Sequence, residues 1–467
     1  MTEGRPKRVV VVGGGIAGMV TALGLADAGH AVRLLERRPF LGGRVYSFHD
    51  AELGRGLDNG QHAMLGCYRE TLAFLDRLGV AGLLHWQGLR MEMREHGRRG
   101  VLRAGHVPAP FHLSRALLGY RLLSRTEQLG AMVAAVRLLD RWKRAPTRLA
   151  EQTVRGLLAD LGQSESVSRR LWDPIAIAAL NVHPTRACAA LFAAVIERAF
   201  FGRARDAAIV LPGAPLAEIF GGPGEAALRQ AGVEVCSRAA LAHVDLDETG
   251  EVAGVRTRDG NAFDCDAVVL ALPPRAVAGI SIAGRLPVDV LGGWVDALQG
   301  TVPIVSAHVS VDHAVDLPEM VGLIGTTTQW LFHTDLFQSR GANVVGPSLL
   351  SCVTSDAGHL DGCDDREIAR TTADEIGALV PELGPVDPKR IRIVREKHAT
   401  IAATIEATAA RPGTETTVPG LLLAGDWVDT GLPATIESAA LSGRMAVTAV
   451  AAMPSVRSGA PRGACAA

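Results

Sequence analysis

Several residue types that mark other classes of protein are scarce in this chain. Its 467 residues include seven cysteines, none of them in a CxxC pair, and its 14 histidines form no i,i+4 metal pair. The cysteines stand at positions 67, 188, 236, 265, 352, 363 and 465. An odd number of scattered cysteines argues against a disulfide scaffold and against structural zinc. The sequence therefore predicts reduced thiols, a cytoplasmic location and no metal site.

An excess of charge of either sign is also missing. Lys and Arg total 48 and Asp and Glu total 49, so the net charge is -1. Without a general positive field, nucleic acid is not an expected partner. A charge-free stretch at residues 9–26 reaches the length of a membrane span, but it contains five glycines. We therefore expect this stretch to belong to a soluble fold, and we expect no integral membrane segment.

The residues that are present predict a large globular protein of two or three domains, because 48% of them are hydrophobic. Residues 8–12 and 31–35 have strand composition and flank a helical pattern at 16–28, which predicts a βαβ unit. Residues 110–205 have helical spacing, and strand patterns return between 205 and 275. A short apolar strand at 420–425 precedes a helix at 435–453. Residues from 454 onward have the composition of a frayed tail.

A glycine motif lies between the first strand and the first helix. Gly13, Gly15 and Gly18 have the spacing that lets a backbone turn approach a pyrophosphate at a helix N-terminus. Glu36 ends the next strand, where its carboxylate can accept both ribose hydroxyls of an adenosine and would repel a 2′-phosphate. The pattern predicts a dinucleotide site. A purely structural glycine turn is the alternative.

Two further motifs carry a family resemblance. Gly42-Gly43-Arg44 follows Glu36, and Gly425-Asp426 precedes a segment that reads Thr435-Ile436-Glu437. Together with the glycine motif, they resemble the FAD-dependent amine oxidase and phytoene desaturase superfamily. The resemblance implies an α/β fold with a Rossmann-like FAD-binding domain of the glutathione-reductase or amine oxidase type and an inserted α+β substrate domain.

The implied FAD-binding domain is discontinuous and comprises residues 1–85, 205–275 and 386–453. The implied substrate domain comprises 86–204 and 276–385, and 454–467 form a disordered tail. The resemblance places FAD contacts at the following residues: Gly13, Gly15, Ala17, Gly18, Glu36, Gly42, Gly43, Arg44, Gln61, His62, Leu241, Gly425, Asp426, Thr435 and Ile436.

A closer resemblance covers almost the whole chain. Asp58-Asn59-Gly60-Gln61-His62, Leu171-Trp172-Asp173-Pro174, Arg395-Glu396-Lys397 and the block from Gly425 to Glu437 are similar, in order and spacing, to the squalene-associated desaturase-like family, the hydroxysqualene dehydroxylases of bacterial hopanoid biosynthesis. The resemblance implies an enzyme that reduces hydroxysqualene to squalene: the hydroxyl leaves as water, and N5 of reduced FAD delivers a hydride. It also implies an isoprenoid lipid substrate.

A departing hydroxyl requires an acid. His62 is the first candidate, because the resemblance places its loop near the flavin ring, and a structural hydrogen bond is the alternative. Asp173 is the second candidate, and a helix-breaking turn before Pro174 is the alternative. Residues 108–146 alternate leucine with arginine, which is typical of helices on anionic membranes and also of ordinary helices with a solvated basic face. Reversible attachment to the inner face of the cell membrane is therefore a hypothesis.

Other functions remain open from the sequence. A carotenoid desaturase would transfer hydride in the opposite direction. An amine or porphyrinogen oxidase is a further alternative. An amine substrate normally requires a cage of aromatic side chains, and this chain has only three tyrosines from which to build one. Prenyl-lipid carriers such as the Rab GDP-dissociation inhibitors share this fold without flavin chemistry, but they do not need Glu36, Gly42-Gly43-Arg44 and Gly425-Asp426. The sequence does not predict the oligomeric state.

Overall fold

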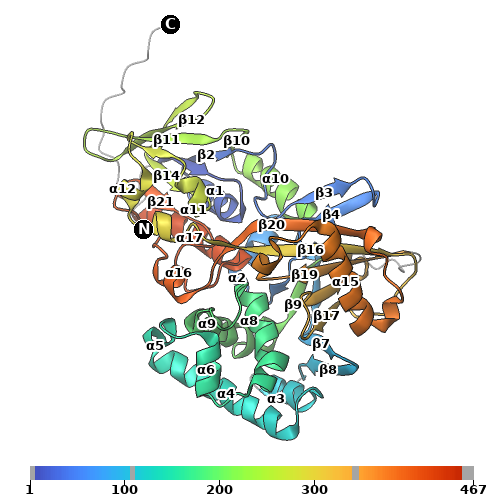
Figure 1. Cartoon of the computed structure of the whole chain (residues 1–467). Helices are drawn as coiled ribbons and strands as arrows, with labels where there is room; N and C mark the ends of the chain where they lie inside the picture. The colour runs from blue at the N-terminus through green and yellow to red at the C-terminus, as the bar shows by residue number, and fades with distance from the viewer. Residues whose placement is uncertain (1–5, 106–110, 339–346, 455–467) are drawn as a thin grey trace.

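The computed structural model describes residues 6–105, 111–338 and 347–454. Its first layer is a parallel sheet of order β10-β2-β1-β14-β21. The strands are β1 (Arg8–Val12), β2 (Ala31–Glu36), β10 (Glu234–Ser237), β14 (Ala267–Leu270) and β21 (Leu421–Leu423). Val9–Val12 are at most 2% exposed, as expected for a strand that is covered on both faces. Three separate parts of the chain build this one sheet (Figure 1).

Helices cover one face of the parallel sheet. They are α1 (Ile16–Asp27), α2 (Arg69–Arg77), α10 (Gly222–Gln230) and α17 (Ile436–Ala452). α1 and α17 pack closely, because a Cβ atom added to Gly443 would lie 2.6 Å from the Ala17 carbonyl oxygen. Buried Lys7 donates through Nζ to the carbonyl oxygens of Val450 and Met453, which satisfies the C-terminal end of α17. The first and last segments of the chain therefore form one unit.

A four-stranded sheet of order β13-β12-β11-β15 covers the other face of the parallel sheet. Its strands are β11 (Leu241–Leu246), β12 (Val252–Thr257), β13 (Ala262–Asp264) and β15 (Ser281–Ile282). Short helices follow at α11 (Pro274–Val277), α12 (Pro287–Leu291) and α13 (Trp294–Ala297). Trp294 stacks on Trp427 with ring centroids 4.9 Å apart. Trp427 is 1% exposed, so it is a core residue of this layer.

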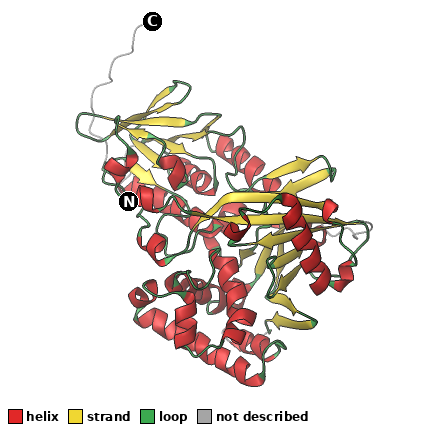
Figure 2. Ribbon diagram, in the orientation of Figure 1, coloured by secondary structure: helices red, strands yellow, loops and turns green. Residues whose placement is uncertain are grey.

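A seven-stranded sheet of order β20-β16-β19-β18-β17-β7-β8 forms the next part of the molecule (Figure 2). Its strands are β7 (Arg90–Glu95), β8 (Arg98–Arg103), β16 (Thr301–Val311), β17 (Met320–Leu323), β18 (Trp330–His333), β19 (Ser348–Thr354) and β20 (Ile391–Ile401). One face packs on α15 (Asp365–Leu379). The other face joins the core of the helical part.

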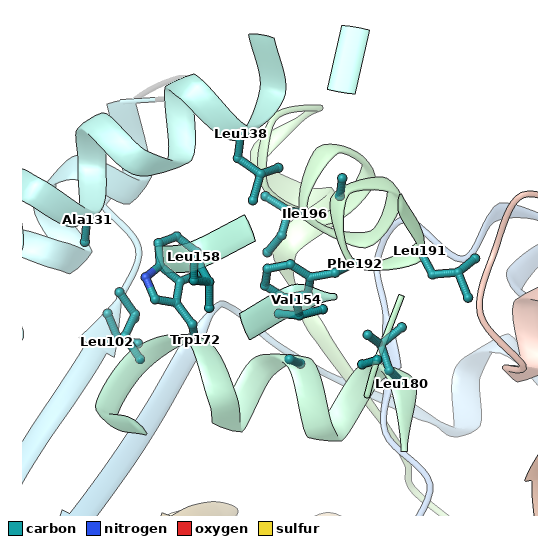
Figure 3. Packing of buried hydrophobic residues seen from close by; sticks show 14 of the residues in the cluster. Leu102, Ala131, Leu138, Val154, Leu158, Trp172, Leu180, Leu191, Phe192 and Ile196 are labelled. Atoms are coloured by element: carbon teal, nitrogen blue, oxygen red, sulfur yellow. The ribbon is translucent and has the colours of Figure 1, made fainter. Parts of the chain in front are cut away.

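The helical part lies at the opposite end of the molecule from β12 (Figure 1). Its helices are α3 (Phe111–Leu118), α4 (Arg125–Arg144), α5 (Pro146–Ala150), α6 (Val154–Asp160), α7 (Glu165–Val167), α8 (Asp173–Leu180) and α9 (Ala189–Phe200). Figure 3 shows their core, in which Trp172, Phe192 and Leu138 point toward one another. Trp172 and Phe192 meet edge to face, with centroids 6.3 Å apart.

Smaller elements connect these parts. A two-stranded sheet pairs β3 (Ser47–Asp50) with β4 (Arg55–Asp58), and a three-stranded sheet joins β5 (Met64–Leu65), β9 (Ile209–Pro212) and β6 (Leu84–Gln87). Two further short α-helices are α14 (Thr334–Gln338) and α16 (Ile405–Ala409). Within the described ranges no helix has the length and apolar character that crossing a membrane requires.

The expected α/β architecture with a parallel nucleotide-binding type of sheet is confirmed, and so is the helical character of residues 111–200. Strand β20 pairs with β16 in the seven-stranded sheet. We had expected its segment, 386–453, in the FAD-binding domain. The division into domains stays a prediction. The expected tail lies outside the described residues from 455 onward, as do residues 106–110 of the region 108–146.

Candidate active site

The glycine turn between β1 and α1 is shaped by close backbone contacts. Gly13 has φ +109°, and a Cβ atom on Gly18 would lie 1.8 Å from the Gly13 carbonyl oxygen. Gly15 is the N-cap of α1, and no side chain caps this helix. The first N–H groups of α1 therefore remain available to an anion, and the helix dipole favours negative charge at this end. A Cβ atom on Gly15 would meet only the Gly43 Cα atom, at 3.9 Å.

Glu36 ends β2 beside this turn and is 7% exposed. Its Oε2 atom accepts a hydrogen bond from the Gly14 amide, and its Oε1 atom accepts one from the Arg38 amide, both at 2.7 Å. Each carboxylate oxygen keeps a second acceptor position, so the group can also bind two ribose hydroxyls. The Ala239 amide donates to the Glu36 carbonyl oxygen at 2.9 Å. This contact brings the start of β11, at Leu241, next to the end of β2.

The Gly42-Gly43-Arg44 segment lies on the glycine turn. The Gly42 amide donates to the Gly14 carbonyl oxygen at 2.8 Å. Gly42 and Gly43 both have positive φ, at +119° and +61°, and a Cβ atom on Gly43 would approach the Gly15 Cα atom to 2.9 Å. Only glycine permits this backbone and this distance. The two glycine segments thus form one cradle without side chains.

Arg44 joins the cradle to the C-terminal part of the chain. Its Nη2 atom lies 2.6 Å from Asp426 Oδ1, and its Nη1 atom donates to the Ala399 carbonyl oxygen at 2.6 Å. Gly425 has φ +148°, and its amide donates to Ser442 Oγ of α17 at 2.8 Å. A charge-assisted pair therefore joins the N-terminal and C-terminal segments of the site.

Arg411 is a site residue that the sequence analysis missed. Its buried guanidinium donates to four carbonyl oxygens of the loop after β21, those of Asp426, Trp427, Val428 and Leu432. Four donors in a fixed plane hold this loop in one shape. A single arginine outside any motif carries no sequence signal for such a role.

The N-terminus of α17 is fixed by side chains. Thr435 is the N-cap, and its Oγ1 atom accepts from the Ser438 amide at 3.2 Å. Ile436 is the first helical residue and is partly buried. Glu437 is 4% exposed and accepts hydrogen bonds from the amide and the hydroxyl of Thr71. These bonds tie α17 to the start of α2.

His62 lies in the loop between β4 and β5 and is partly buried. Its Nδ1 atom lies 2.9 Å from the Gly60 carbonyl oxygen. Since a carbonyl only accepts, Nδ1 carries the proton, and Nε2 is the free position of the neutral ring. Burial lowers the pKa of His62, and the hydrogen bond to Gly60 and the charge of Asp58 oppose this shift. Gln61 donates to the His62 carbonyl oxygen at 3.2 Å.

Residues distant in the sequence hold this loop in place through hydrogen bonds. The Asp58 carboxylate accepts from Ser47 Oγ at 2.6 Å and from the Leu216 amide at 2.9 Å, and burial raises the pKa of Asp58. The Asp58 carbonyl oxygen accepts from His308 Nε2 of β16 at 3.0 Å. Burial lowers the pKa of His308 to about 4, so this second histidine is neutral and supports the loop as a hydrogen-bond donor.

Glu396 on β20 is a further charged group of the site. Asn59 donates through Nδ2 to Glu396 Oε2 at 3.4 Å and to the Arg44 carbonyl oxygen at 2.9 Å. The Glu396 charge also acts on the pKa of His62. The segment Arg395-Glu396-Lys397 contributes to the family resemblance, but its position in the sequence does not predict this role.

Asp173 lies in a different environment. It is the first residue of α8, and its Oδ2 atom lies 2.7 Å from Arg155 Nη2 of α6. Burial raises the pKa of Asp173, and the Arg155 charge opposes this shift. Its partners in the described part of the chain belong to the helical part, not to the loop of His62. These contacts favour a structural role, and the catalytic hypothesis for Asp173 stays a prediction.

The residues present fit a dinucleotide. An uncapped helix N-terminus and two glycine segments can receive a pyrophosphate, and the Glu36 carboxylate can receive a ribose. No cluster of three or more metal-ligating side chains occurs in residues 6–105, 111–338 and 347–454. Fold and site together define a dinucleotide-binding protein of the oxidoreductase type.

Comparison with known proteins specifies the class further. The family model described as flavin containing amine oxidoreductase matches residues 16–451. The chain belongs to this family. It is accordingly an FAD-dependent oxidoreductase, as the sequence resemblance implied.

Individual relatives span nearly the full length. The chain is 30% identical to a hydroxysqualene dehydroxylase of Rhodopseudomonas palustris, covering 96% of this chain and 99% of that one. It is 29% identical to the enzyme of the same name from Zymomonas mobilis, covering 93% and 97%. A 15-cis-phytoene desaturase of Synechococcus elongatus is 25% identical, covering 95% and 96%. Cyclohexylamine oxidase from Brevibacterium oxydans has the same fold, with a TM-score of 0.69 at 18% identity, covering 96% and 99%.

Proposed function

We propose that this protein reduces hydroxysqualene to squalene. The observation that carries the proposal is the similarity to hydroxysqualene dehydroxylases, which extends over nearly all of both chains at 30% identity, against 25% for the phytoene desaturase. The alternative in which hydride moves in the opposite direction, a carotenoid desaturase, has weaker support. The complete set of Glu36, Gly42-Gly43-Arg44 and Asp426 argues against a prenyl-lipid carrier that lacks flavin chemistry.

Several residues of the candidate cofactor site have proposed roles in binding FAD. We infer that the first turn of α1, at Gly15, Ala17 and Gly18, binds the pyrophosphate and that Glu36 binds the adenosine ribose. The pair of Arg44 and Asp426 holds the Gly42-Gly43 segment next to the turn at Gly425. Reduced FAD supplies a hydride when it is bound. The protein must then orient the alcohol, exclude water and provide a proton.

His62 is the proposed proton donor. Its Nδ1–H is committed to the Gly60 carbonyl oxygen, so a second proton can be held only at Nε2 and delivered from there. Burial lowers the pKa of this ring, which makes the protonated form scarcer at neutral pH and a stronger acid when it is present. Proton transfer from Nε2 to the departing hydroxyl would release water and leave an allylic cation on the substrate. Asp58, His308 and Asn59 position the loop.

The proposed substrate is a lipid, so we infer that the enzyme works in the cytoplasm at the inner face of the cell membrane. An isoprenoid alcohol partitions into the bilayer and must pass from there to the protein.

The decisive experiment is an anaerobic incubation of the photoreduced holoenzyme with C30 and C40 lipids, followed by product analysis. The proposal expects squalene from hydroxysqualene, in step with oxidation of the flavin. Desaturation of phytoene by the oxidised holoenzyme would identify a carotenoid desaturase. Squalene formed without oxidation of the flavin would exclude the hydride mechanism.

A further inference from the structure

Exposed apolar side chains gather on one helical hairpin. The described residues include seven exposed large apolar side chains, and four of them lie on α3 and α4: Leu118, Leu129, Val133 and Val136. Leu129, Val133 and Val136 are 54%, 50% and 62% exposed. Their spacing of four and three residues places them on one face of α4. They form a stripe along the middle of this helix.

Folding does not explain this stripe. The opposite face of α4 already packs into the core through Ala131, Ala134 and Leu138 (Figure 3). Its N-terminus has a complete capping box, in which Ser124 and Glu127 satisfy each other's backbone amides. An anchored and capped helix gains no stability from leucine and valine in water. The outer residues therefore suit a contact outside the chain.

The charge around the stripe is positive. Residues 111–144 contain seven Lys and Arg but only two carboxylates, Glu127 and Asp140, whereas the whole chain has a net charge of -1. Glu127 is used in the capping box, and Asp140 pairs with Arg144 at 2.7 Å. The exposed cations flank the stripe at both ends: Arg121 and Arg125 before it, and Arg137, Lys143 and Arg144 after it.

A small cavity extends the positive region. It lies between β8 and α3, has a volume of about 300 Å³ and is lined by Arg103 and Arg115. Gly119, which follows Leu118, also lines it. Cationic side chains thus border the apolar residues on the α3 side as well.

We propose that the outer face of the α3–α4 hairpin, formed by Leu118, Leu129, Val133 and Val136 with their flanking arginines, docks on a bilayer that contains anionic lipid. The inference rests on the proposed function only in so far as a lipid substrate gives the docking a purpose. α4 lies along the membrane surface, with its apolar stripe among the acyl chains and its cations at the headgroups. Two copies of this chain would instead bring two positive faces together.

Flotation of the yellow holoenzyme tests the surface directly. The vesicles are phosphatidylcholine with or without phosphatidylglycerol, and flavin absorbance reports both folding and position. We expect the wild type to float with anionic vesicles at low salt. The variant Leu129→Gln/Val133→Gln/Val136→Gln should bind at least about tenfold more weakly. Leu286→Gln is the matched control, because Leu286 is 63% exposed and lies outside the hairpin.

A second variant separates charge from burial. Arg121→Gln/Arg137→Gln should lose about fivefold in binding per removed charge on anionic vesicles, and high salt should weaken the wild type in the same way. Failure of the wild type to float at low salt would overturn the proposal, as would full binding by the triple glutamine variant. A change from dimer to monomer in that variant, without vesicle binding by the wild type, would assign the stripe to self-association.

An activity assay keeps this inference apart from the proposed function. With hydroxysqualene in detergent micelles, the triple glutamine variant should match the wild type, and with substrate in anionic vesicles it should be slower by about the loss in binding. Flotation itself needs no substrate. Vesicle binding without turnover would therefore refute the proposed function alone, and turnover without vesicle binding would refute the docking surface alone.

Discussion

The glycine turn at residues 13–18 and the loop at residues 58–62 both belong to the site, but different forces hold them. The turn is shaped by contacts among neighbouring backbone atoms, such as that between Gly18 and the Gly13 carbonyl oxygen. The loop is held by partners far away in the chain, since Asp58 bonds to residues 158 and 250 positions away and Asn59 to one 337 positions away. The shape of the glycine turn is thus encoded locally, whereas the environment of the proposed acid depends on the assembled fold.

His62→Ala should produce the largest change. Losing the proton donor should slow oxidation of the reduced flavin by hydroxysqualene about 10²- to 10⁴-fold, while FAD content stays intact. Anaerobic stopped-flow absorbance measures this rate, and the flavin-to-protein ratio is the control. A wild-type rate in this variant would remove His62 as the acid and leave Asp173 as the remaining candidate.

Two alanine substitutions separate the roles of the glycines in the turn. Gly18→Ala should destabilise the protein by about 3 kcal/mol, because the new Cβ atom meets backbone 1.8 Å away that has no flexible end to move. Gly15 has φ -77°, and a Cβ atom there would make only an ordinary contact with the Gly43 Cα atom, at 3.9 Å. Gly15→Ala should therefore leave the stability of the apoprotein unchanged or raise it by up to about 1 kcal/mol, and weaken FAD.

Thermal unfolding of the apoprotein and FAD titration measure these two effects. Equal loss of stability in both alanine variants would contradict the distinction between a packing glycine and a ligand-facing glycine.

Glu36→Ala should weaken FAD about ten- to a hundredfold. The substitution removes the charge-assisted bonding to the ribose, a loss of about 1.5–3 kcal/mol in total. It also releases the Gly14 and Arg38 amides, so Glu36→Gln is the better-matched control and should have an intermediate effect. Fluorescence titration of the apoprotein with FAD gives both constants. Unchanged affinity would refute the ribose role.

The pH dependence of the reaction rate tests the protonation state of His62 without a substitution. The pKa of His62 lies below its usual value because burial disfavours the charged ring. An acid must be protonated, so the rate should be highest below about pH 6.5 and fall up to about tenfold per pH unit above the pKa of His62. Single-turnover rates between about pH 5 and pH 8 provide the test. A rate that rises with pH would show that His62 does not act as the acid.

Asp173→Asn should have the smallest effect on the chemistry. Asp173 pairs with Arg155 in the helical part, so its loss should lower stability by about 1 kcal/mol and change the rate by less than about threefold. Thermal unfolding and flavin oxidation rates separate the two quantities. A hundredfold slower variant with normal stability would instead assign Asp173 to proton transfer.

Much of the cofactor site could be predicted because its residues occur in short motifs. The expected strand at 8–12 is β1 itself, and the helix expected at 16–28 ends one residue earlier than predicted. Arg411 could not be predicted, because its role arises only where the loop after β21 folds around its guanidinium. The same holds for His308 of β16, which forms a hydrogen bond with the Asp58 carbonyl oxygen at the start of the His62 loop.

The printed sequence alone is enough to predict the glycine motifs of the candidate cofactor site, the acidic residue at the end of β2, and the family. These features depend on steric rules within a few residues or on motifs whose order is distinctive. The buried face of α4, the pairing of Asp173 with Arg155 and the lowered pKa of His62 follow only from the packed arrangement of the whole chain. Burial and electrostatic environment depend on which distant segments pack together, and local sequence does not contain that information.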